Sequence, residues 1–393
     1  MQKEKTVPEI RFKGFEEEWS YKRIDDIFDE YSLKNNNQYP LLSIKQGIGT
    51  VLREESGRTV KSDAENISNL KLVHKGSLIM HLRSFEGGLE KANHDGLVSP
   101  AYHIFKSECA DTEMYYYYFR RKKFINTDLN NHVYGIRDGR SIDINGFNSI
   151  LIPYTSLLEQ NKIGQLIVGL DFLIQSQELK LKKLNEVKQS FLSKMFASEN
   201  QKSPEIRFKG FEEEWTYKRI DDIFDEYSLK NNNQYPLLSI KQGIGTVLRE
   251  ESGRTVKSDA ENISNLKLVH KGSLIMHLRS FEGGLEKANH DGLVSPAYHI
   301  FKSDCADTEM YYYYFRRKKF INTDLNNHVY GIRDGRSIDI NGFNSILVPY
   351  TSRLEQNKIG QLIIGLDSLI KSQELKLKKI NSIKQALLEK MFC

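Results

Sequence analysis

The sequence predicts a tandem duplication of mixed α/β (α+β) lobes, separated by two long helices that form an antiparallel coiled coil with pseudo-two-fold symmetry. Three observations lead to this fold class. The chain repeats itself after 196 residues, each repeat begins with short strand-like runs between turns, and each ends with a proline-free segment of helical periodicity. The expected domains are the lobes 1–156 and 199–352 and the helices 157–198 and 353–393.

The repeat covers the whole chain, since its 393 residues equal 2 × 196 + 1. All eight prolines fall into pairs at this offset. A period this long belongs to a duplicated domain rather than to a solenoid unit. The helical segments of the two copies differ often, whereas between Pro8 and Ser156 the copies differ only at Ser20/Thr216, Glu108/Asp304 and Ile152/Val348.

Each lobe alternates short strands with turns. Strands are predicted at Leu41–Ile44, Leu78–Leu82 and Ile150–Ile152, because glycine, asparagine and serine bound these apolar runs. A helix is predicted from about Asp111, with acidic residues in its first turn and basic residues after its end. Tyr115–Tyr118 in this helix could stack single-stranded bases, but four consecutive positions point all round a helix. At least half of these tyrosines are therefore expected to pack inside the lobe.

The segment from Glu159 to Phe196 is predicted to form one helix about 55 Å long, at 1.5 Å per residue. Apolar residues recur in it every three or four positions, which is typical of a coiled-coil seam with a single stutter near Gln177. The expected seam residues are Ile163, Leu166, Leu170, Leu173 and Gln177, with Ile359, Leu362, Leu366, Leu369 and Gln373 in the second copy.

Such a helix overhangs a lobe of about 150 residues, whose diameter is about 30–35 Å, so we expect the two helices to pair. A closed internal duplication favours two-fold symmetry and hence an antiparallel pair. Gln177 and Gln373 would then meet at the crossing. The alternative is two independent helices, each packed on its own lobe.

Composition excludes several classes of protein. Apolar residues make up 39% and charged residues 28%, which suffices for packed cores, and the net charge of +5 permits a polyanionic partner. No apolar run reaches the eighteen or so residues of a membrane span, and the N-terminus lacks the hydrophobic stretch of a signal peptide. Three cysteines without a Cys-x-x-Cys pair support neither a disulfide framework nor a zinc site. We expect a cytoplasmic protein with no membrane segment, metal or cofactor.

The sequence contains no catalytic motif. A phosphate-binding loop and the Asn/Asp-Pro-Pro-Tyr/Phe element of DNA amino-methyltransferases are both absent. Gly47-Ile48-Gly49 lacks the third glycine of a dinucleotide fingerprint, and the acidic residues between Asp25 and Glu30 are expected to be a solvated face rather than a metal site. We expect no catalytic residue.

Three polar groups in each lobe carry side chains suited to reading base edges, because arginine pairs with guanine and asparagine with adenine. They lie in a glycine-rich, hairpin-like region, in a basic segment after a strand, and in a glycine-containing loop. The candidate DNA-binding residues are Lys45, Gln46, Arg83, Asn130, Asn131, His132, Arg137 and Arg140, with Lys241, Gln242, Arg279, Asn326, Asn327, His328, Arg333 and Arg336 in the second copy. Taken alone, each group is also typical of an ordinary polar loop.

The distribution of differences between the copies favours a shared ligand. Surface loops normally drift fastest, yet these loops are identical in both lobes while the helices have diverged. Folding alone would tolerate exchange in the lobes as well. A recent duplication is the alternative, but it leaves the divergence of the helices unexplained.

The chain resembles the specificity subunit of a type I restriction–modification system over its whole length. The resemblance rests on Pro8–Phe15 (Pro-Glu-Ile-Arg-Phe-Lys-Gly-Phe) followed by Trp19, and on Ile152-Pro153 leading into Leu158-Glu159-Gln160 and a long helix. Both patterns recur in the second copy, at Pro204–Phe211 with Trp215 and at Val348-Pro349 with Leu354-Glu355-Gln356.

The resemblance implies a non-catalytic subunit with two target-recognition domains, each reading one half of a bipartite site in double-stranded DNA. It also implies that the helices act as a spacer and dock two modification (methyltransferase) subunits, in an assembly that recruits restriction (translocase/nuclease) subunits. Recognition domains in this family usually differ, whereas here they are nearly the same, so we expect an interrupted palindrome. The alternative is a non-catalytic coiled-coil scaffold that binds only partner proteins.

Overall fold

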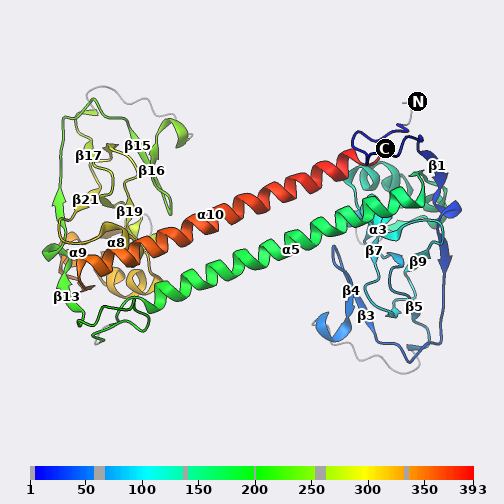
Figure 1. Cartoon of the computed structure of the whole chain (residues 1–393), viewed down its shortest axis with the longest axis horizontal. Helices are drawn as coiled ribbons and strands as arrows, with labels where there is room; N and C mark the ends of the chain where they lie inside the picture. Colours follow the sequence, from blue (N-terminus) through cyan, green and yellow to red (C-terminus); the bar gives the residue numbers. More distant parts are fainter. Residues whose placement is uncertain (1–4, 57–66, 136–139, 199–200, 253–262, 332–335) are drawn as a thin grey trace. The chain divides into compact units, whose positions relative to one another are not determined.

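The computed structural model describes residues 5–56, 67–135, 140–198, 201–252, 263–331 and 336–393. Its contacts divide the chain into two compact units: Met1–Glu178 with Leu375–Cys393 forms unit 1, and Leu179–Glu374 forms unit 2. Each unit therefore contains one lobe, the beginning of the helix that follows this lobe, and the end of the other helix (Figure 1). The two strand-rich lobes and the two long helices predicted from the repeat are present.

The lobe of unit 1 is built from small antiparallel sheets. The largest has the strand order β2-β9-β6-β7, formed by Asp29–Tyr31, His103–Lys106, Leu78–Met80 and Glu90–Lys91. The paired strands are β1 (Ser20–Arg23) with β12 (Leu151–Tyr154), β3 (Leu42–Lys45) with β4 (Gly49–Leu52), β5 (Lys71–Val73) with β8 (Gly96–Val98), and β10 (Val133–Tyr134) with β11 (Ser141–Ile142). Because β1 pairs with β12, the start and the end of the lobe are held together.

Short helices connect these strands. They are η1 (Ile24–Asp26), η2 (Arg53–Ser56), α2 (Ser84–Gly87), α3 (Thr112–Phe119), the π-helix η3 (Phe124–Leu129), η4 (Asn130–His132) and α4 (Ile144–Ser149). Asp111 caps α3 by accepting a hydrogen bond from the backbone N–H of Met114 at 2.7 Å, as expected for an aspartate at this position.

The tyrosines of α3 belong to the core. Tyr115, Tyr116 and Tyr118 are buried, and Tyr115 donates its hydroxyl to the carbonyl of Pro153 at 2.9 Å. Tyr117 is half-buried and donates to Asp171 at 2.5 Å. The expectation that these rings pack inside the lobe is confirmed, and they are not free to stack nucleic-acid bases.

The lobe of unit 2 repeats this arrangement. Its strands are β13 (Thr216–Arg219), β14 (Asp225–Tyr227), β15 (Leu238–Lys241), β16 (Gly245–Leu248), β17 (Lys267–Val269), β18 (Leu274–Met276), β19 (Glu286–Lys287), β20 (Gly292–Val294), β21 (His299–Lys302), β22 (Val329–Tyr330), β23 (Ser337–Ile338) and β24 (Leu347–Tyr350). Its short helices are η6 (Ile220–Asp222), η7 (Glu250–Ser252), α7 (Ser280–Gly283), α8 (Thr308–Phe315), η8 (Phe320–Leu325), η9 (Asn326–His328) and α9 (Ile340–Ser345).

A buried carboxylate joins each lobe to its long helix. Glu159, in the first turn of α5 (Leu157–Lys194), accepts hydrogen bonds from Arg11 Nε at 2.7 Å and from Trp19 Nε1 at 3.1 Å. Gln160 accepts a further one from the backbone N–H of Asp111 at 2.9 Å. The Leu-Glu-Gln and Trp motifs of the sequence therefore form a structural clasp between lobe and helix.

The two long helices, α5 and α10 (Arg353–Lys390), each contain 38 residues and pack against each other antiparallel within each unit. In unit 1, Asp171 of α5 forms an ion pair with Lys384 of α10, and Phe392 packs on Tyr118 of the lobe. The beginning of α5 and the end of α10 therefore both lie at this lobe. Unit 2 has the same arrangement with the helices exchanged. The alternative of independent helices is wrong.

The buried stripe of the helices corrects the predicted seam at Leu173 and Leu369. These side chains are 38% and 57% exposed, whereas the adjacent Ile174 and Ile370 are buried. Apolar residues occupy both phases in this part of the sequence, so spacing alone could not choose between them. The stripe also runs through the buried Ile167 and Ile363 rather than the half-buried Leu166 and Leu362. It thereby keeps an unbroken alternation of three and four residues, and the predicted stutter disappears. The stripe in α10 contains Ile359, Ile363, Leu366, Ile370, Gln373 and Ile380.

Gln373 is buried and Gln177 is half-buried, so both lie toward the stripe. Their meeting stays a prediction, because they belong to different units. Over the part of the chain that the structure describes, none of the helices has the length and apolar character needed to cross a membrane.

Candidate nucleic-acid interface

The three predicted polar groups of the first lobe converge on the short helix α2. Strand β6 ends at Met80, and the segment from His81 to Arg83 leads directly into α2. The hairpin β3–β4 contacts α2 from one side: a methyl group added at Gly87 would lie 1.7 Å from Gln46 Nε2. Glycine at position 87 therefore permits the close approach that fixes the hairpin tip next to α2.

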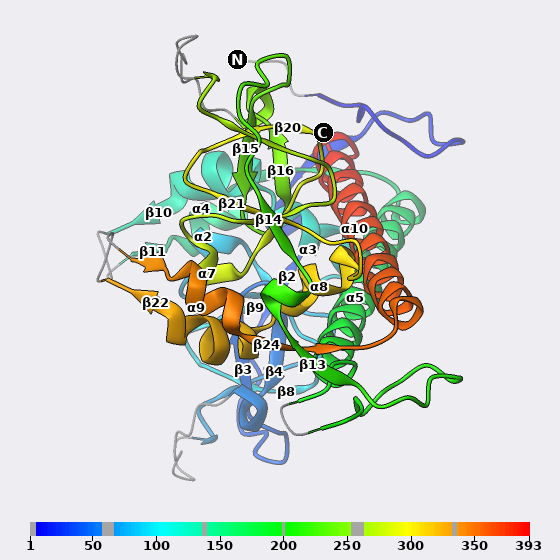
Figure 2. The ribbon, with the colours of Figure 1, turned by 90° about the vertical axis from the view of Figure 1, so that its left-hand side faces the viewer.

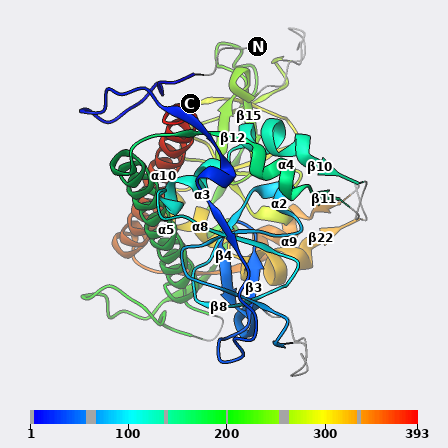
Figure 3. The same ribbon diagram turned by 90° about the vertical axis from the view of Figure 1, so that its right-hand side faces the viewer.

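The loop that contains η4 and the β10–β11 hairpin contacts α2 from another side. The Arg140 guanidinium lies 4.3 Å from the centre of the Phe85 ring, a cation–π arrangement, and donates a hydrogen bond to Asn130 Oδ1 at 3.2 Å. Figure 3 shows α2, α4, β10 and β11 in this part of unit 1. Residues from three distant segments of the chain therefore surround one helix of four residues.

His132 is half-buried and packs against α4. Its backbone carbonyl accepts a hydrogen bond from Asp143 N at 2.8 Å. Its ring lies against α4, where a methyl group at Gly146 would be 2.2 Å from His132 Nδ1. Asn131, next to it, is exposed. A role for His132 in DNA binding stays a prediction.

Arg83 is exposed beside α2, where it forms an ion pair with Glu86 at 2.8 Å. Its neighbour His81 has a pKa lowered to about 4, because burial and the charges of Arg120 and Arg83 disfavour the imidazolium. His81 is neutral at physiological pH, and its Nδ1 accepts a hydrogen bond from Arg83 N at 3.3 Å. It contributes no positive charge to the surface.

A buried carboxylate that the sequence did not reveal supports the β3–β4 hairpin. Glu90 is fully buried and accepts a hydrogen bond from the backbone N–H of Gly47 at 2.8 Å and one from Arg120. Burial raises the pKa of Glu90, while the bonds from Gly47 and Arg120 oppose that rise. Comparison of the two copies could not reveal the pair of Glu90 and Arg120, because nearly all lobe residues are identical between the copies.

Exposed apolar side chains accompany each polar group, and sequence reasoning missed them. Ile48 at the hairpin tip, Leu82 before α2 and Tyr134 in β10 are each 60–63% exposed. Large apolar side chains at the surface are informative when they gather beside convergent polar groups. Such side chains contact the methyl group of thymine in DNA grooves.

The second lobe has the same contacts around α7, which Figure 2 labels together with α9 and β22 of this unit. Arg336 lies 4.3 Å from the Phe281 ring centre and donates to Asn326 at 3.4 Å, while Gln242 approaches Gly283 as Gln46 approaches Gly87. The corresponding exposed apolar residues are Ile244, Leu278 and Tyr330. The remaining candidates in this lobe are Lys241, Arg279, Asn327 and His328. Arg137 and Arg333 lie outside the described residues.

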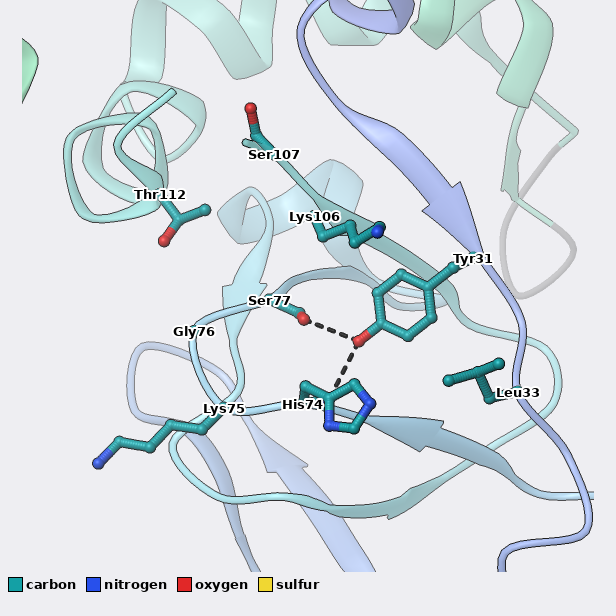
Figure 4. Close-up of a pocket in the computed structure, with 9 residues that line it drawn as sticks. All are labelled: Tyr31, Leu33, His74, Lys75, Gly76, Ser77, Lys106, Ser107 and Thr112. Carbon is teal, nitrogen blue, oxygen red and sulfur yellow. Dashed lines mark hydrogen bonds between the residues drawn. The ribbon is translucent and has the colours of Figure 1, made fainter. Parts of the chain in front are cut away.

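A separate pocket of about 450 Å³ lies at the other end of β6 (Figure 4). The hydroxyl groups of Tyr31 and Ser77 are already engaged, since the two share a hydrogen bond of 2.7 Å and His74 N donates to Tyr31 at 3.0 Å. These bonds fix the turn between β5 and β6. The lining residues are Tyr31, Leu33, His74, Lys75, Gly76, Ser77, Lys106, Ser107 and Thr112. Among the described side chains, no group of three or more His, Cys, Asp or Glu residues could hold a metal ion.

No protein-family model matches the chain. Solved structures, in contrast, match it over nearly its whole length. The type I restriction–modification system S subunit from M. genitalium is 16% identical, with 98% of this chain and 99% of that chain covered and a TM-score of 0.56. The chain has the fold of a type I S subunit. The HsdS subunit from Thermoanaerobacter tengcongensis is 14% identical, with 95% and 96% covered and a TM-score of 0.48.

Within this S-subunit fold, the two candidate surfaces occupy equivalent places in the two lobes, one around α2 and one around α7. Each combines exposed Arg, Asn and Gln side chains with exposed apolar side chains on the segments that pack around a short helix. Such a surface offers hydrogen-bond donors and acceptors for base edges, and methyl contacts for thymine.

Proposed function

We propose that this chain is the specificity subunit of a type I restriction–modification complex and reads an interrupted palindrome in double-stranded DNA. The observation that carries this proposal is the convergence of the same polar and apolar side chains around α2 and around α7, in a chain with the S-subunit fold. In this function, Arg140, Asn131 and Gln46 read base edges, and lysines hold phosphates. The subunit is not catalytic and acts in the cytoplasm.

The partners in this proposal are two modification (methyltransferase) subunits and the restriction (translocase/nuclease) subunits. Support comes from the long helices, which carry exposed apolar side chains at positions outside their buried stripe. Phe172 and Leu179 of α5, and Leu375 of α10, are examples. Exposed apolar residues at helical spacing are typical of a face that docks a partner helix. These helices would fix the distance between the two half-sites.

A palindromic site is the first expected outcome. If a two-fold axis relates the two nearly identical readers, they meet the same half-site in opposite orientations. Mapping N6-methyladenine across the host genome, with and without this gene, should give inverted half-sites around a non-specific spacer. An asymmetric bipartite motif would contradict this proposal, because identical surfaces could not read different half-sites.

Lengthening both helices should lengthen the spacer only. Insertion of one heptad into α5 and one into α10 keeps the phase of the buried stripe and adds about 10 Å, at 1.5 Å per residue. At 3.4 Å per base pair, the methylated motif should keep its half-sites and gain about three base pairs between them. A changed half-site or an unchanged spacer would show that the helices do not set this distance.

Substitution of Arg140 and Arg336 by alanine should relax target choice. A bidentate arginine–guanine contact contributes about 1–3 kcal/mol of discrimination, so binding to the mapped site should weaken by about that amount for each half-site. Binding to random DNA should change much less. Arg23→Ala with Arg219→Ala is the matched control, because it removes exposed arginines from β1 and β13. Equal losses of affinity for the mapped site in both double variants would show that Arg140 does not read bases.

The competing function is a scaffold that binds only proteins. It predicts no mobility shift of any DNA duplex when the methyltransferase subunit is present. A shift that depends on the mapped site would exclude this alternative.

A further inference from the structure

A second pocket in unit 1 lies next to the candidate reading hairpin. It has a volume of about 500 Å³ and includes Gly47, the residue that follows Gln46 in the β3–β4 hairpin. We call it the lysine pocket. Its lining residues are Gly47, Tyr116, Tyr117, Arg120, Arg121, Lys122, Lys123, Asp171, Lys384, Gln385, Leu388 and Glu389.

Three of the five cations in this pocket have structural partners. Arg120 is paired with the buried Glu90, and Lys384 is paired with Asp171. Arg121 lies over the rings of Tyr118 and Phe392, at 5.5 and 5.0 Å from their centres. These contacts join the lobe, α5 and α10 into one wall of the pocket.

Lys122 and Lys123 are different. Both are exposed, lie between Arg121 and the start of η3, and form no ion pair with any residue in the described ranges. Glu389 is the one lining acid that also has no ion pair among the described residues, so the two lysines give the pocket an excess of positive charge. The pocket therefore suits an anion.

We propose that Lys122 and Lys123, with Lys318 and Lys319 in unit 2, bind DNA backbone phosphates beside each half-site and so fix the register of the reading hairpin. This inference rests on the proposed function. DNA is favoured over an acidic protein segment because Gly47 belongs to both surfaces, so a duplex that reaches Gln46 and Ile48 passes this pocket. Phosphate contacts set position and orientation, whereas base contacts set sequence.

The two proposed phosphate sites, one in each unit, differ by one charge. At the position of Glu389 in unit 1, the equivalent residue of unit 2 is Ser193, while the paired Lys384 and Asp171 correspond to Lys188 and Asp367. An acid beside phosphate opposes binding, so unit 1 holds its half-site more weakly than unit 2. Glu389→Ser should tighten binding to any duplex and make its salt dependence steeper.

The experiment compares salt dependence in the intact complex. The variant K122A/K123A/K318A/K319A, assembled with the methyltransferase subunit, is titrated with a duplex of random sequence and with a duplex containing the mapped site. Each lost phosphate contact reduces the slope of log K against log salt by about 0.9, so four should reduce it by about 3 to 4. Affinity for both duplexes should fall together, which leaves the ratio between them nearly unchanged.

A matched control removes the same charge elsewhere. K13A/K34A/K209A/K230A takes four exposed lysines from the lobes and should leave the slope within about one unit of the wild type. An equal loss in both variants would show that total charge sets the slope and would overturn the proposal. Exposed alanine substitutions cost little stability, which thermal unfolding of each variant verifies.

Two further outcomes distinguish a failure of the phosphate assignment from a failure of the proposed DNA-reading function. If the pocket variant no longer binds the methyltransferase subunit in size-exclusion chromatography, the pocket docks a protein and the phosphate assignment is wrong. If the wild-type complex binds neither duplex at low salt, the proposed function itself fails and this inference fails with it.

Discussion

Replacing Phe392 by alanine should destabilise unit 1 by about 3–5 kcal/mol and leave unit 2 nearly unchanged, because a buried phenylalanine is lost without replacement. The Phe392 side chain is 3% exposed and packs on Tyr118, with ring centres 5.6 Å apart. It belongs to the core of the first lobe although it lies at the far end of the sequence.

Phe196→Ala is the matched variant for unit 2. Phe196 occupies the equivalent position, with its ring 5.4 Å from that of Tyr314, and belongs to the core of the second lobe. Hydrogen exchange read by mass spectrometry can separate the lobes, because peptides that contain Glu108 or Asp304 differ in mass. Each variant should lower protection in one unit only. Equal loss in both lobes after either substitution would contradict the division into two units.

Glu159→Ala should cost about 3–5 kcal/mol in unit 1, the amount typical of removing one partner from a buried ion pair. The Glu159 side chain is 1% exposed. Its loss leaves the guanidinium of Arg11 and the indole N–H of Trp19 without their acceptor. Glu355→Ala should do the same in unit 2, where Arg207 and Trp215 make the equivalent bonds. Similar stability of the variant and the wild type would show that the clasp is dispensable.

The pH dependence of this effect has a defined sign. Burial alone would raise the pKa of Glu159, but hydrogen bonds from Arg11 and Thr155 outweigh it and lower the pKa below 4.5. A lowered folded-state pKa stabilises the fold fully above the unfolded value near 4.5, and this stabilisation is lost as pH falls through the folded value. The stability difference between the wild type and Glu159→Gln should therefore shrink below about pH 4.5. Denaturant unfolding at several pH values measures it.

The repeat made the architecture predictable. A period of 196 residues, strands bounded by turns and a proline-free helical segment led to lobes and paired helices, and all are present. The tyrosines of α3 were also predictable as core residues, because consecutive helical positions cannot all face a ligand. These inferences depend on local periodicity, which a single sequence contains.

Features that depend on tertiary packing were not predictable. The phase of the buried stripe was missed because Leu173 and Ile174 are both apolar, and sequence spacing does not tell which of them is buried. The pairing of Glu90 with Arg120 joins residues thirty positions apart, and nothing in their local sequence links them. The polar groups around α2 were found separately, whereas their convergence depends on how the strands bring them together.

The exchange of helix ends between the lobes has an evolutionary consequence. Each core includes residues from the end of the other repeat's helix: Met391 and Phe392 complete the first, and Met195 and Phe196 complete the second. A protein made of one repeat would lack the residues that complete its core. Two such proteins could complete each other's cores only by associating. Fusing the repeats into one chain makes that association intramolecular and independent of protein concentration, and it frees the two helices to diverge.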